Sequence, residues 1–509
     1  MPDSIIRIGS APGIKRDGTM LEGDAHVDGQ WCRFSRGLPR KMLGYRAINK
    51  YLTAAPRALH AYTRNDLTYV HAGSAAALER LFIDDTLNTS VIVDRTPAAL
   101  TASDQNLWQF DIDHATDGTP LLMAQVAPNG NCLCNSEGGQ LFYGDLFGTA
   151  ALTEVTNLPT TYSLSGGVVS LHPYTVAFGA EGFVMWSVPT DPTDFTGSGA
   201  GSAYVTGQNI VRGLPMRGGP GASPSGLLWS ADSLIRMTYI GGTPVFQFDT
   251  ISAQSSILSS SSVIEYDGVF YWLGTDRFLS FNGVVREVEN IFNRDFFFDN
   301  VNMDYRQKVF AFKVPRFGEI WWCFPKGDST EPDHAVIYNV RENVWYDTPL
   351  PNGGRGAGLP PAIFRYPLVS GVTDDGSGYR LWVHERGYDE VDGLTINPVQ
   401  SFYETGDISL PIEQQIDRST QVILIEPDFI QQGDMTVTVH GRANARAPEV
   451  ESEPRTITET ASTPTEQVAF FKEQRRQMRF RFESNVVGGY YETGVPLAHI
   501  RPGDGTVLG

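Results

Sequence analysis

The stretch Ser262–Val288 reads SVIEYDGVFYWLGTDRFLSFNGVVREV, four short runs of Val, Ile, Tyr, Phe and Trp separated by three turns. Asp267-Gly268 and Asn282-Gly283 are dipeptides that readily take two consecutive positive φ angles, so they favour tight two-residue hairpin turns. The segment Gly274–Arg277 predicts a four-residue turn between them. We therefore expect a four-stranded antiparallel meander in which both dipeptides are structural. Because such a sheet has one buried face and two open edges, it needs neighbours of the same kind.

The same alternation of short strands and turns repeats from about residue 51 to residue 400. Clusters of three or four predicted strands, each spread over about forty residues, favour a β-propeller over a sandwich or a barrel. No WD dipeptide and no kelch Gly-Gly signature recurs at a fixed offset, so the propeller is expected to be irregular. Gly (52 residues), Pro (31 residues) and the 11% aromatic content suit many short strands and turns.

The two ends of the chain differ from this middle region. Residues 1–50 form a strap in which Trp31–Lys50 contains six Lys or Arg and no acid. After about Gln400, strands such as Met478–Phe482 alternate apolar and cationic residues, which indicates a second, smaller β platform domain at 401–509. A short helix is expected near Glu466–Arg476. The predicted fold class is all-β, an irregular β-propeller at 51–400 followed by the platform domain.

Composition limits the functional classes. The chain has 58 acidic and 39 basic residues and a formal net charge of −19, which argues against gripping nucleic acid over the whole surface. The basic strap is expected to dock on the acidic propeller or on a neighbouring subunit rather than on DNA phosphates. The four cysteines are too few and too scattered for a disulfide framework or a zinc site. Without a signal peptide or an apolar run of about 18 residues, we expect cytoplasmic folding and no membrane-spanning segment.

Several ordered motifs resemble the tail nozzle proteins of short-tailed phages, also called tail hub, tail tubular protein B or packaged-DNA stabilisation proteins. The resemblance spans nearly the whole chain, and the order and spacing of the motifs carry it. The motifs are Trp31…Arg33-Phe34…Gly37…Pro39…Lys41…Gly44-Tyr45, Gly226–Ser230 leading into Ser233–Ile235, Tyr271–Gly274, Phe281–Gly283, and Arg475–Phe482 followed by Ser484-Asn485, Gly488-Gly489 and Gly494.

The resemblance implies a structural virion protein of the phage tail. It implies a homohexameric ring at the distal end of the tail, made in the host cytoplasm, whose channel retains the genomic DNA and then conducts it during ejection. The implied partners are a tail adaptor or head-to-tail connector ring, tail fibres or spikes, and the DNA itself. No catalysis, cofactor or metal is expected.

Two Gly/Pro-rich segments, Pro189–Ser225 and Thr348–Pro361, are predicted to be long loops, and long loops in compact domains are often functional. If they project into the channel, they would act as its gate, because Gly-rich backbone swings freely. The alternative is that both are outer-rim loops that contact fibres or solvent. The candidate gate residues are Gly197, Gly199, Gly201, Gly218, Gly219, Gly353, Gly354 and Arg355.

Enzyme and ligand sites have weaker signals. Asp111–Gly118 (DIDHATDG) resembles a calcium loop but has Ala115 where a ligand is required, and a solvated hairpin is the preferred interpretation. The sequence Gly197–Gly201 does not link a strand to a helix, so it gives little support for a phosphate site. His60 and His71 lack metal-ligand spacing.

Two alternatives to a tail nozzle remain open from sequence. A propeller-type glycan-binding or glycan-hydrolysing tail protein would need opposed carboxylates, for which Asp191 and Asp194 are candidates by residue type alone. It would also use aromatic pairs such as Trp321-Trp322 and Trp345-Tyr346 to stack sugars, although core packing is the default for strand aromatics. A soluble propeller scaffold that binds proteins is the second alternative.

Overall fold

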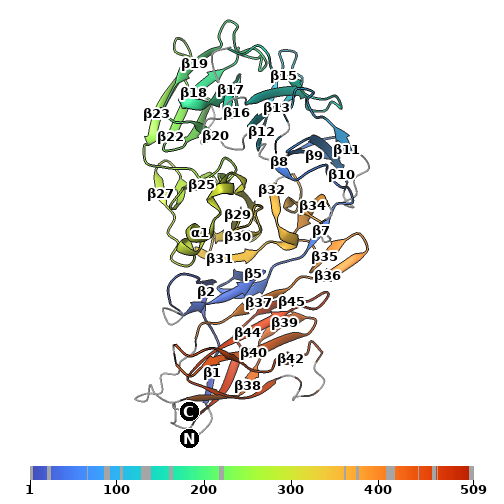
Figure 1. Cartoon of the computed structure of the whole chain (residues 1–509), viewed down its shortest axis with the longest axis vertical. Coiled ribbons are helices and arrows are strands. Elements are labelled where there is room, and N and C mark those ends of the chain that lie inside the picture. Colours follow the sequence, from blue (N-terminus) through green and yellow to red (C-terminus); the bar gives the residue numbers. More distant parts are fainter. Residues whose placement is uncertain are drawn as a thin grey trace.

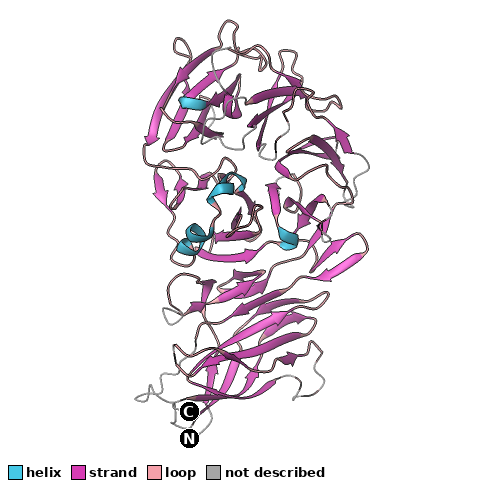
Figure 2. Cartoon of the chain, in the orientation of Figure 1, coloured by secondary structure: helices cyan, strands magenta, loops and turns pink. Residues whose placement is uncertain are grey.

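Strands account for nearly all of the regular structure (Figure 2). The structure, a computed structural model, describes residues 4–19, 24–65, 67–84, 92–101, 103, 107–127, 139–159, 164–216, 223–359, 363–373, 376, 378–407, 419–444, 446–460, 463, 466 and 468–503. Within these ranges the helical segments are the α-helix α1 (Arg294–Asn300) and the short 3-10 segments η1 (Ala180–Gly182), η2 (Met303–Lys308) and η3 (Pro351–Gly353). The all-β prediction is confirmed.

Seven consecutive sheets lie in a circle in the upper part of Figure 1. Six are four-stranded antiparallel meanders: β8 (Pro56–Arg64), β9 (Leu67–Ser74), β10 (Leu78–Ile83) and β11 (Ile92–Asp94); β12 (Leu107–His114), β13 (Pro120–Ala127), β14 (Gln140–Asp145) and β15 (Thr153–Glu154); β16 (Leu164–Leu171), β17 (Tyr174–Gly179), β18 (Phe183–Trp186) and β19 (Gly201–Tyr204); β20 (Ile210–Met216), β21 (Ser225–Ser230), β22 (Leu234–Tyr239) and β23 (Phe246–Ser252); β24 (Ile264–Tyr266), β25 (Val269–Leu273), β26 (Phe278–Phe281) and β27 (Val285–Glu287); β28 (Phe310–Val314), β29 (Glu319–Phe324), β30 (His334–Asn339) and β31 (Val344–Pro349).

The seventh sheet has six strands and combines distant parts of the chain. Its order is β32 (Arg355–Leu359), β33 (Leu368–Val372), β34 (Tyr379–His384), β7 (Tyr45–Ala47), β35 (Asp389–Asp392) and β36 (Thr395–Pro398). Strand β7 comes from the N-terminal fifty residues, and it pairs antiparallel with β34 and parallel with β35.

The first strands of the seven sheets face the middle of the circle. Strand β8 contacts β12, β12 contacts β16, and β16 contacts β20; β24 contacts β28, β28 contacts β32, and β32 packs back on β8. Between the fourth and fifth sheets, the rings of Trp229 and Trp272 lie 5.8 Å apart. The circle of sheets therefore closes on itself, and we call it the ring.

The inner strands of the ring sheets, such as β29 and β30, are buried on both faces, which explains their aromatic content. All six residues of β29 are buried. Because successive strand residues point to opposite faces, Trp321 packs into one apolar cluster and Trp322 into another. Each Trp therefore joins its sheet to a different neighbour.

The remaining strands form the unit at the lower end of Figure 1, which we call the C-terminal unit. They are β37 (Ser401–Glu404), β38 (Thr420–Glu426), β39 (Phe429–Gln432), β40 (Met435–Arg442), β41 (Val450–Glu451), β42 (Arg455–Ile457), β43 (Ala469–Arg475), β44 (Gln477–Ser484), β45 (Tyr490–Thr493) and β46 (Leu497–Pro502). Its sheets enclose an apolar core that includes Val422, Val437, Phe480 and Phe482.

The N-terminal strap is distributed over both units. Its strands are β1 (Ser4–Arg7), β2 (Ala11–Ile14), β3 (Ala25–His26), β4 (Asp28–Gln30), β5 (Cys32–Ser35), β6 (Leu38–Lys41) and the ring strand β7. The sheet orders in the C-terminal unit are β1-β46-β38-β43, β4-β37-β44-β40-β41 with β42 on β40, and β39-β45-β6-β5; β2 pairs with β3 in parallel. The strap thus adds strands to the C-terminal unit before it enters the ring.

The structure corrects three local predictions. The helix expected near Glu466–Arg476 is wrong, because β43 occupies 469–475 and alternates buried Ala469 and Phe471 with exposed Phe470 and Lys472. The segment Pro189–Ser225 contains β19 and β20, and Thr348–Pro361 contains β32, so neither is one long loop. The Asn282-Gly283 turn has three residues rather than two, because Phe281 pairs with Val285.

Close packing against aromatic side chains explains some of the glycines in the segments that were predicted to be loops. A Cβ at Gly201 would lie 2.5 Å from a ring carbon of Trp186, and one at Gly358 would lie 2.8 Å from the Cβ of Phe312. These glycines let one strand pass over an aromatic side chain of its neighbour. By contrast, Asp267 and Gly268 have φ angles of 50° and 83° and form the expected two-residue turn.

Replacing Gly283 by Val should lower the free energy of unfolding by more than about 1 kcal/mol. Gly283 has a φ of 111°, and a Cβ there would meet no atom within 4 Å, so backbone strain alone opposes the side chain. The matched control is Gly207→Val, at a glycine with equal space and no positive φ. Equal chemical-denaturation midpoints for the two variants would contradict the strained turn.

Candidate functional site

The strongest polar constellation of the described chain surrounds Arg33 on β5, between the ring and the C-terminal unit. The guanidinium binds two carboxylates in a fork-to-fork manner. Its Nε and Nη2 donate to Glu319 at 2.7 and 3.0 Å, and its Nη1 and Nη2 donate to Glu385 at 2.7 and 2.5 Å. Glu319 begins β29, and Glu385 follows β34. One buried side chain of the strap therefore fixes two sheets of the ring.

Aromatic groups enclose this ion triad. The Arg33 guanidinium lies 3.8 Å from the ring centroid of Phe317, a cation–π contact. Tyr346 Oη and Trp321 Nε1 donate to Glu319 at 2.7 and 2.9 Å, so its remaining acceptor sites are also used. The triad is fully enclosed, and its role is to hold elements together rather than to bind a solute.

Burial and charge shift the pKa values of this group in the expected directions. Burial alone would lower the pKa of Arg33, but the carboxylates of Glu319 and Glu385 hold it above its ordinary value. Burial raises the pKa of Glu385, and Arg33 opposes that rise. Burial together with the charge of Glu319 raises the pKa of Tyr346 far above its ordinary value, so its hydroxyl stays a proton donor.

Other strap residues extend this contact. We call the region formed by Trp31, Arg33, Lys41, Gly44 and the residues that they contact the joint. Buried Lys41 donates to the Ser484 carbonyl of the C-terminal unit at 2.9 Å, and burial lowers the pKa of Lys41 to about 8. A Cβ at Gly44 would lie 2.2 Å from the Asp389 carbonyl oxygen, so only glycine fits there. The joint is therefore built from the residues whose spacing defined the strap motif.

The other cations of the strap are also paired inside the chain where the structure gives their partners. Arg36 and Arg40 both reach Glu492, at 3.3 and 3.0 Å. Arg33, Arg36, Arg40 and Lys41 thus have partners within the same molecule. Arg33 docks on acids of the ring, where the strap is expected to dock, whereas Arg36 and Arg40 use an acid of the C-terminal unit.

Sequence reasoning did not identify Glu319 and Glu385. They lie 286 and 352 residues from Arg33, so no local spacing could reveal the triad. The one available signal was Glu319 itself, a single acid directly before the apolar run Ile320–Phe324. An acid that opens a fully buried strand needs a cationic partner.

Among the described residues, one group could hold a metal ion by geometry. Donor atoms of Glu404, His440 and Glu449 lie within 4.8 Å of one another. However, Arg479 already donates its Nε to Glu404 and its Nη2 to Glu449. The guanidinium occupies the place that a cation would take, so we assign this group to structural ion pairing.

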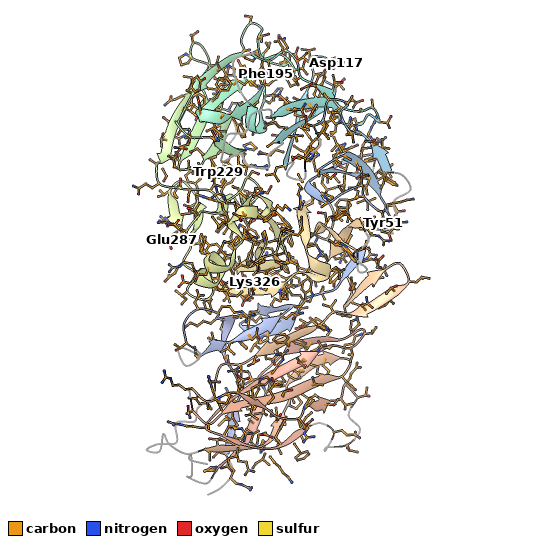
Figure 3. All side chains as sticks on the ribbon, viewed as in Figure 1. Tyr51, Asp117, Phe195, Trp229, Glu287 and Lys326 are labelled. Carbon is orange, nitrogen blue, oxygen red and sulfur yellow. The ribbon has the colours of Figure 1, made fainter. Side chains whose placement is uncertain are left out.

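The calcium-loop alternative at Asp111–Gly118 does not form a converging ligand set. Asp111 accepts the Ser170 backbone N–H at 2.7 Å, and Asp113 accepts the hydroxyl of Thr175. Asp117 accepts the Thr119 backbone N–H in the exposed hairpin turn, at the top of the ring in Figure 3. The first two carboxylates brace the neighbouring sheet instead.

The candidate gate residues lie in several environments. Gly197, Gly199 and Gly201 lie in and after the turn that precedes β19, and Gly353 and Gly354 lie around η3. Gly218 and Gly219 lie outside the described residues. Arg355 is 1% exposed and donates to His384 Nε2 at 3.1 Å, so its side chain is a core group. A gating role for the glycines stays a prediction.

The alternative that two aromatic pairs stack sugars is wrong. Trp321, Trp322, Trp345 and Tyr346 are all buried in apolar clusters, because both faces of their sheet are covered.

Asp194, a carboxylate candidate for glycan hydrolysis, accepts backbone N–H groups of Thr196 and Gly197 and the side-chain amide of Asn157, so it organises its own turn.

The histidine pair at 60 and 71 lies between β8 and β9. The two rings stack 6.2 Å apart, and burial lowers the pKa of His60 to about 4. His71 is fully buried, and its Nε2 lies 3.0 Å from Arg95 Nη1. His71 is therefore a core residue, and His60 is a half-buried residue packed beside it.

The middle of the ring contains a cavity of about 360 Å³. Its walls come from the first strands of several sheets and include Arg57, His60, Gln109, Arg212 and Lys313. Arg57 pairs with Glu331, and Lys313 reaches Glu265. The cavity has both polar and apolar walls, and acids lie beside two of its cations, Arg57 and Lys313.

No protein-family model matches this chain. No curated protein matches it. Among solved structures it is similar to the crystal structure of the computationally designed Ika8 protein, with a TM-score of 0.37 and 10% identity over 66% of this chain and 98% of that chain. A likeness of this size carries no weight for function. In the described part of the chain, every helix is too short or too polar to cross a bilayer.

Replacing Arg33 by Met should lower the free energy of unfolding by about 3–5 kcal/mol, because it leaves two buried carboxylates without a cation. Lys at this position should restore little, since it cannot form the two bidentate contacts. The matched control is Arg36→Met, whose 78% exposed side chain also pairs with an acid and should change stability by less than about 1 kcal/mol. Denaturant unfolding measures all three, and equal losses at 33 and 36 would contradict the triad.

Replacing Asp111 by Asn should stabilise the protein at pH 7.5. Burial raises the pKa of Asp111 to about 6, so its ionisation in the folded protein lowers stability as the pH rises from its ordinary pKa of 3.8 towards 6 and above. Asn keeps an acceptor for Ser170 and cannot ionise. A gain of about 1–3 kcal/mol is expected at pH 7.5, shrinking towards zero near pH 4.

The matched control for this pH dependence is Asp117→Asn in the same hairpin. The backbone N–H of Thr119 holds the pKa of Asp117 below its ordinary value, so this change should give no gain at pH 7.5. Thermal unfolding at the two pH values provides the measurement. A stability gain for Asp111→Asn that does not depend on pH would refute the ionisation mechanism.

Proposed function

We propose that this chain is a structural virion protein that forms the distal tail nozzle, or hub, of a short-tailed phage. In this proposal six identical copies assemble into a ring whose channel retains and then conducts the genome. Each chain folds as an irregular seven-bladed β-propeller, which is the ring of sheets, followed by a platform domain, which is the C-terminal unit.

The closed order of the seven sheets supports the propeller. Each sheet places its first strand towards the centre, and the last sheet packs on the first through β32 and β8. The seventh sheet also takes β7, the strand that precedes the first sheet in the chain, so backbone hydrogen bonds join the two ends of the circle in one sheet. In a typical β-propeller each sheet has its first strand next to the central axis, and one sheet combines strands from both ends of the circle.

The joint is the observation that carries the functional proposal. The motif residues Trp31, Arg33, Lys41 and Gly44, on which the resemblance to nozzle proteins depends, all lie at the joint. Their contacts link the ring to the C-terminal unit through buried ion pairs and close backbone packing. A protein that bears load between a tail adaptor and fibres needs such a rigid connection.

Electrostatics support a channel that does not hold DNA tightly. The net charge is −19, and four strap cations are paired within the molecule. DNA carries one charge per about 1.7 Å of axis, so unpaired cations along a channel would slow its passage. The proposed partners are the adaptor ring, the fibres or spikes, and the passing DNA.

Electron microscopy of the purified full chain tests the proposal. We expect ring-shaped particles of identical copies with an open axis, and native mass spectrometry should give six copies per particle. Addition of linear duplex DNA in physiological salt should produce no tight complex on the outer surface. A chain that stays monomeric at all concentrations, or that hydrolyses glycans, would refute the nozzle proposal.

A further inference from the structure

The turn between β26 and β27 contains an Asn-Gly pair, and its surroundings bear on the chemical stability of that pair. Asn282, Gly283 and Val284 form this three-residue turn, and all three are exposed. Strand β27 is the outermost strand of the fifth sheet and lies at the left of the ring in Figure 1. The Asn282 side chain is therefore accessible to water and to hydroxide.

The backbone nitrogen that follows an Asn can convert the side-chain amide into a carboxylate. The deprotonated nitrogen attacks Cγ, the Cγ–Nδ2 bond breaks, and ammonia leaves after taking up a proton. The succinimide ring that results is then opened by one water molecule. Opening at Cγ gives aspartate, whereas opening at the main-chain carbonyl gives isoaspartate, in which the chain runs through Cβ and Cγ. The net reaction consumes one water, releases one ammonia and involves no oxidation or reduction.

This reaction needs a side-chain amide and a following backbone nitrogen that are both free to move. In the described part of the chain, nothing hydrogen-bonds to the Asn282 side chain or to the Gly283 N–H. A Cβ at Gly283 would meet no atom within 4 Å, so there is room around the attacking nitrogen. Glycine also lets the backbone rotate at low steric cost. The turn therefore meets both requirements.

Two comparable turns of the ring fail one requirement each. The second described Asn-Gly pair begins at Asn352, whose Nδ2 donates to Glu390 at 2.6 Å, so its amide is held in place. In the other tight turn of the fifth sheet, the Gly268 N–H donates to Glu265 at 2.6 Å, so the nitrogen that would attack is occupied. The same dipeptide chemistry is thus restrained at these turns by hydrogen bonds that Asn282 lacks.

We propose that Asn282 is a site of spontaneous deamidation in the folded protein and that Asn352 is protected from it. The hydrogen bond from Asn352 to a carboxylate must break before its amide reacts, which slows the reaction there at least about tenfold relative to Asn282. The product adds one negative charge at the rim of a pocket of about 480 Å³ that Phe270 and Phe281 line. The inference goes beyond the proposed function and does not depend on it.

The first test follows both sites in the same molecule. The full chain is incubated in its folded state at mildly alkaline pH, and peptide mass spectrometry measures conversion of Asn282 and Asn352 over time. Conversion at Asn282 should be at least about tenfold faster. The control is the same incubation in guanidinium chloride, where the fold is lost and the ratio of the two rates should fall towards one.

Two outcomes of this test would overturn the proposal. One is equal rates at Asn282 and Asn352 in the folded protein. The other is an Asn282 that keeps its amide in the folded protein while it converts in denaturant. Fragmentation of the modified peptide also identifies the route, because the succinimide gives isoaspartate as well as aspartate. Aspartate alone would exclude attack by the Gly283 nitrogen.

The second test uses the charge of the whole molecule. The chain has a third Asn-Gly pair, at 129–130, which lies outside the described residues, so all variants carry Asn129→Gln. On isoelectric focusing this background should develop an acidic species with time. Asn282→Gln should abolish that species, because glutamine would have to form a larger ring, whereas the matched control Asn352→Gln should retain it. An acidic species that forms equally fast in Asn282→Gln would refute the assignment.

Discussion

The pairing of Arg33 with Glu319 and Glu385 is the interaction on which the arrangement of the two units depends. A guanidinium buried in protein is tolerated only when its charge and its donors are matched, and four N–H···O contacts at 2.5–3.0 Å meet that requirement. A matched fork allows one geometry, so it fixes the position of β5 relative to β29 and the end of β34. Apolar contacts such as that between Trp31 and Trp321 then pack around a frame that is already aligned.

This dependence explains why two cations of the strap, Arg33 and Lys41, are buried. A strap held by apolar contacts alone has alternative registers, because shifted apolar surfaces still bury area. Directional ion pairs remove those alternatives, since a shifted Arg33 leaves three charges unpaired. Lys41 adds the same constraint on the other side, towards Ser484. Directional ion pairs therefore determine how the ring and the C-terminal unit are positioned, as much as buried apolar area holds them together.

The sequence predicted the local structure well and the long-range structure poorly. Alternating apolar residues and the Asp267-Gly268 turn predict the meander β24–β27 because strand and turn preferences act over a few residues. The Gly-rich segments were misinterpreted as loops because a glycine such as Gly201 is required by the Trp186 ring of the adjacent strand. The segment 469–475 forms a strand because β38 offers it a partner. Glu319 and Glu385 were missed because tertiary folding alone brings them to Arg33.

The distribution of the strap has a consequence for how the chain folds during synthesis. Strand β1 at residues 4–7 pairs with β46 at 497–502, and β7 waits for β34 and β35. Residues 4–47 are thus synthesised long before the strands with which they pair, and Trp31 and Phe34 lack the ring residues Trp321 and Tyr346 that they pack against until those are made. Contacts between such distant segments slow folding and prolong exposure of apolar surface. Completion of the sheet that contains β1 therefore waits until residues 497–502 have been synthesised.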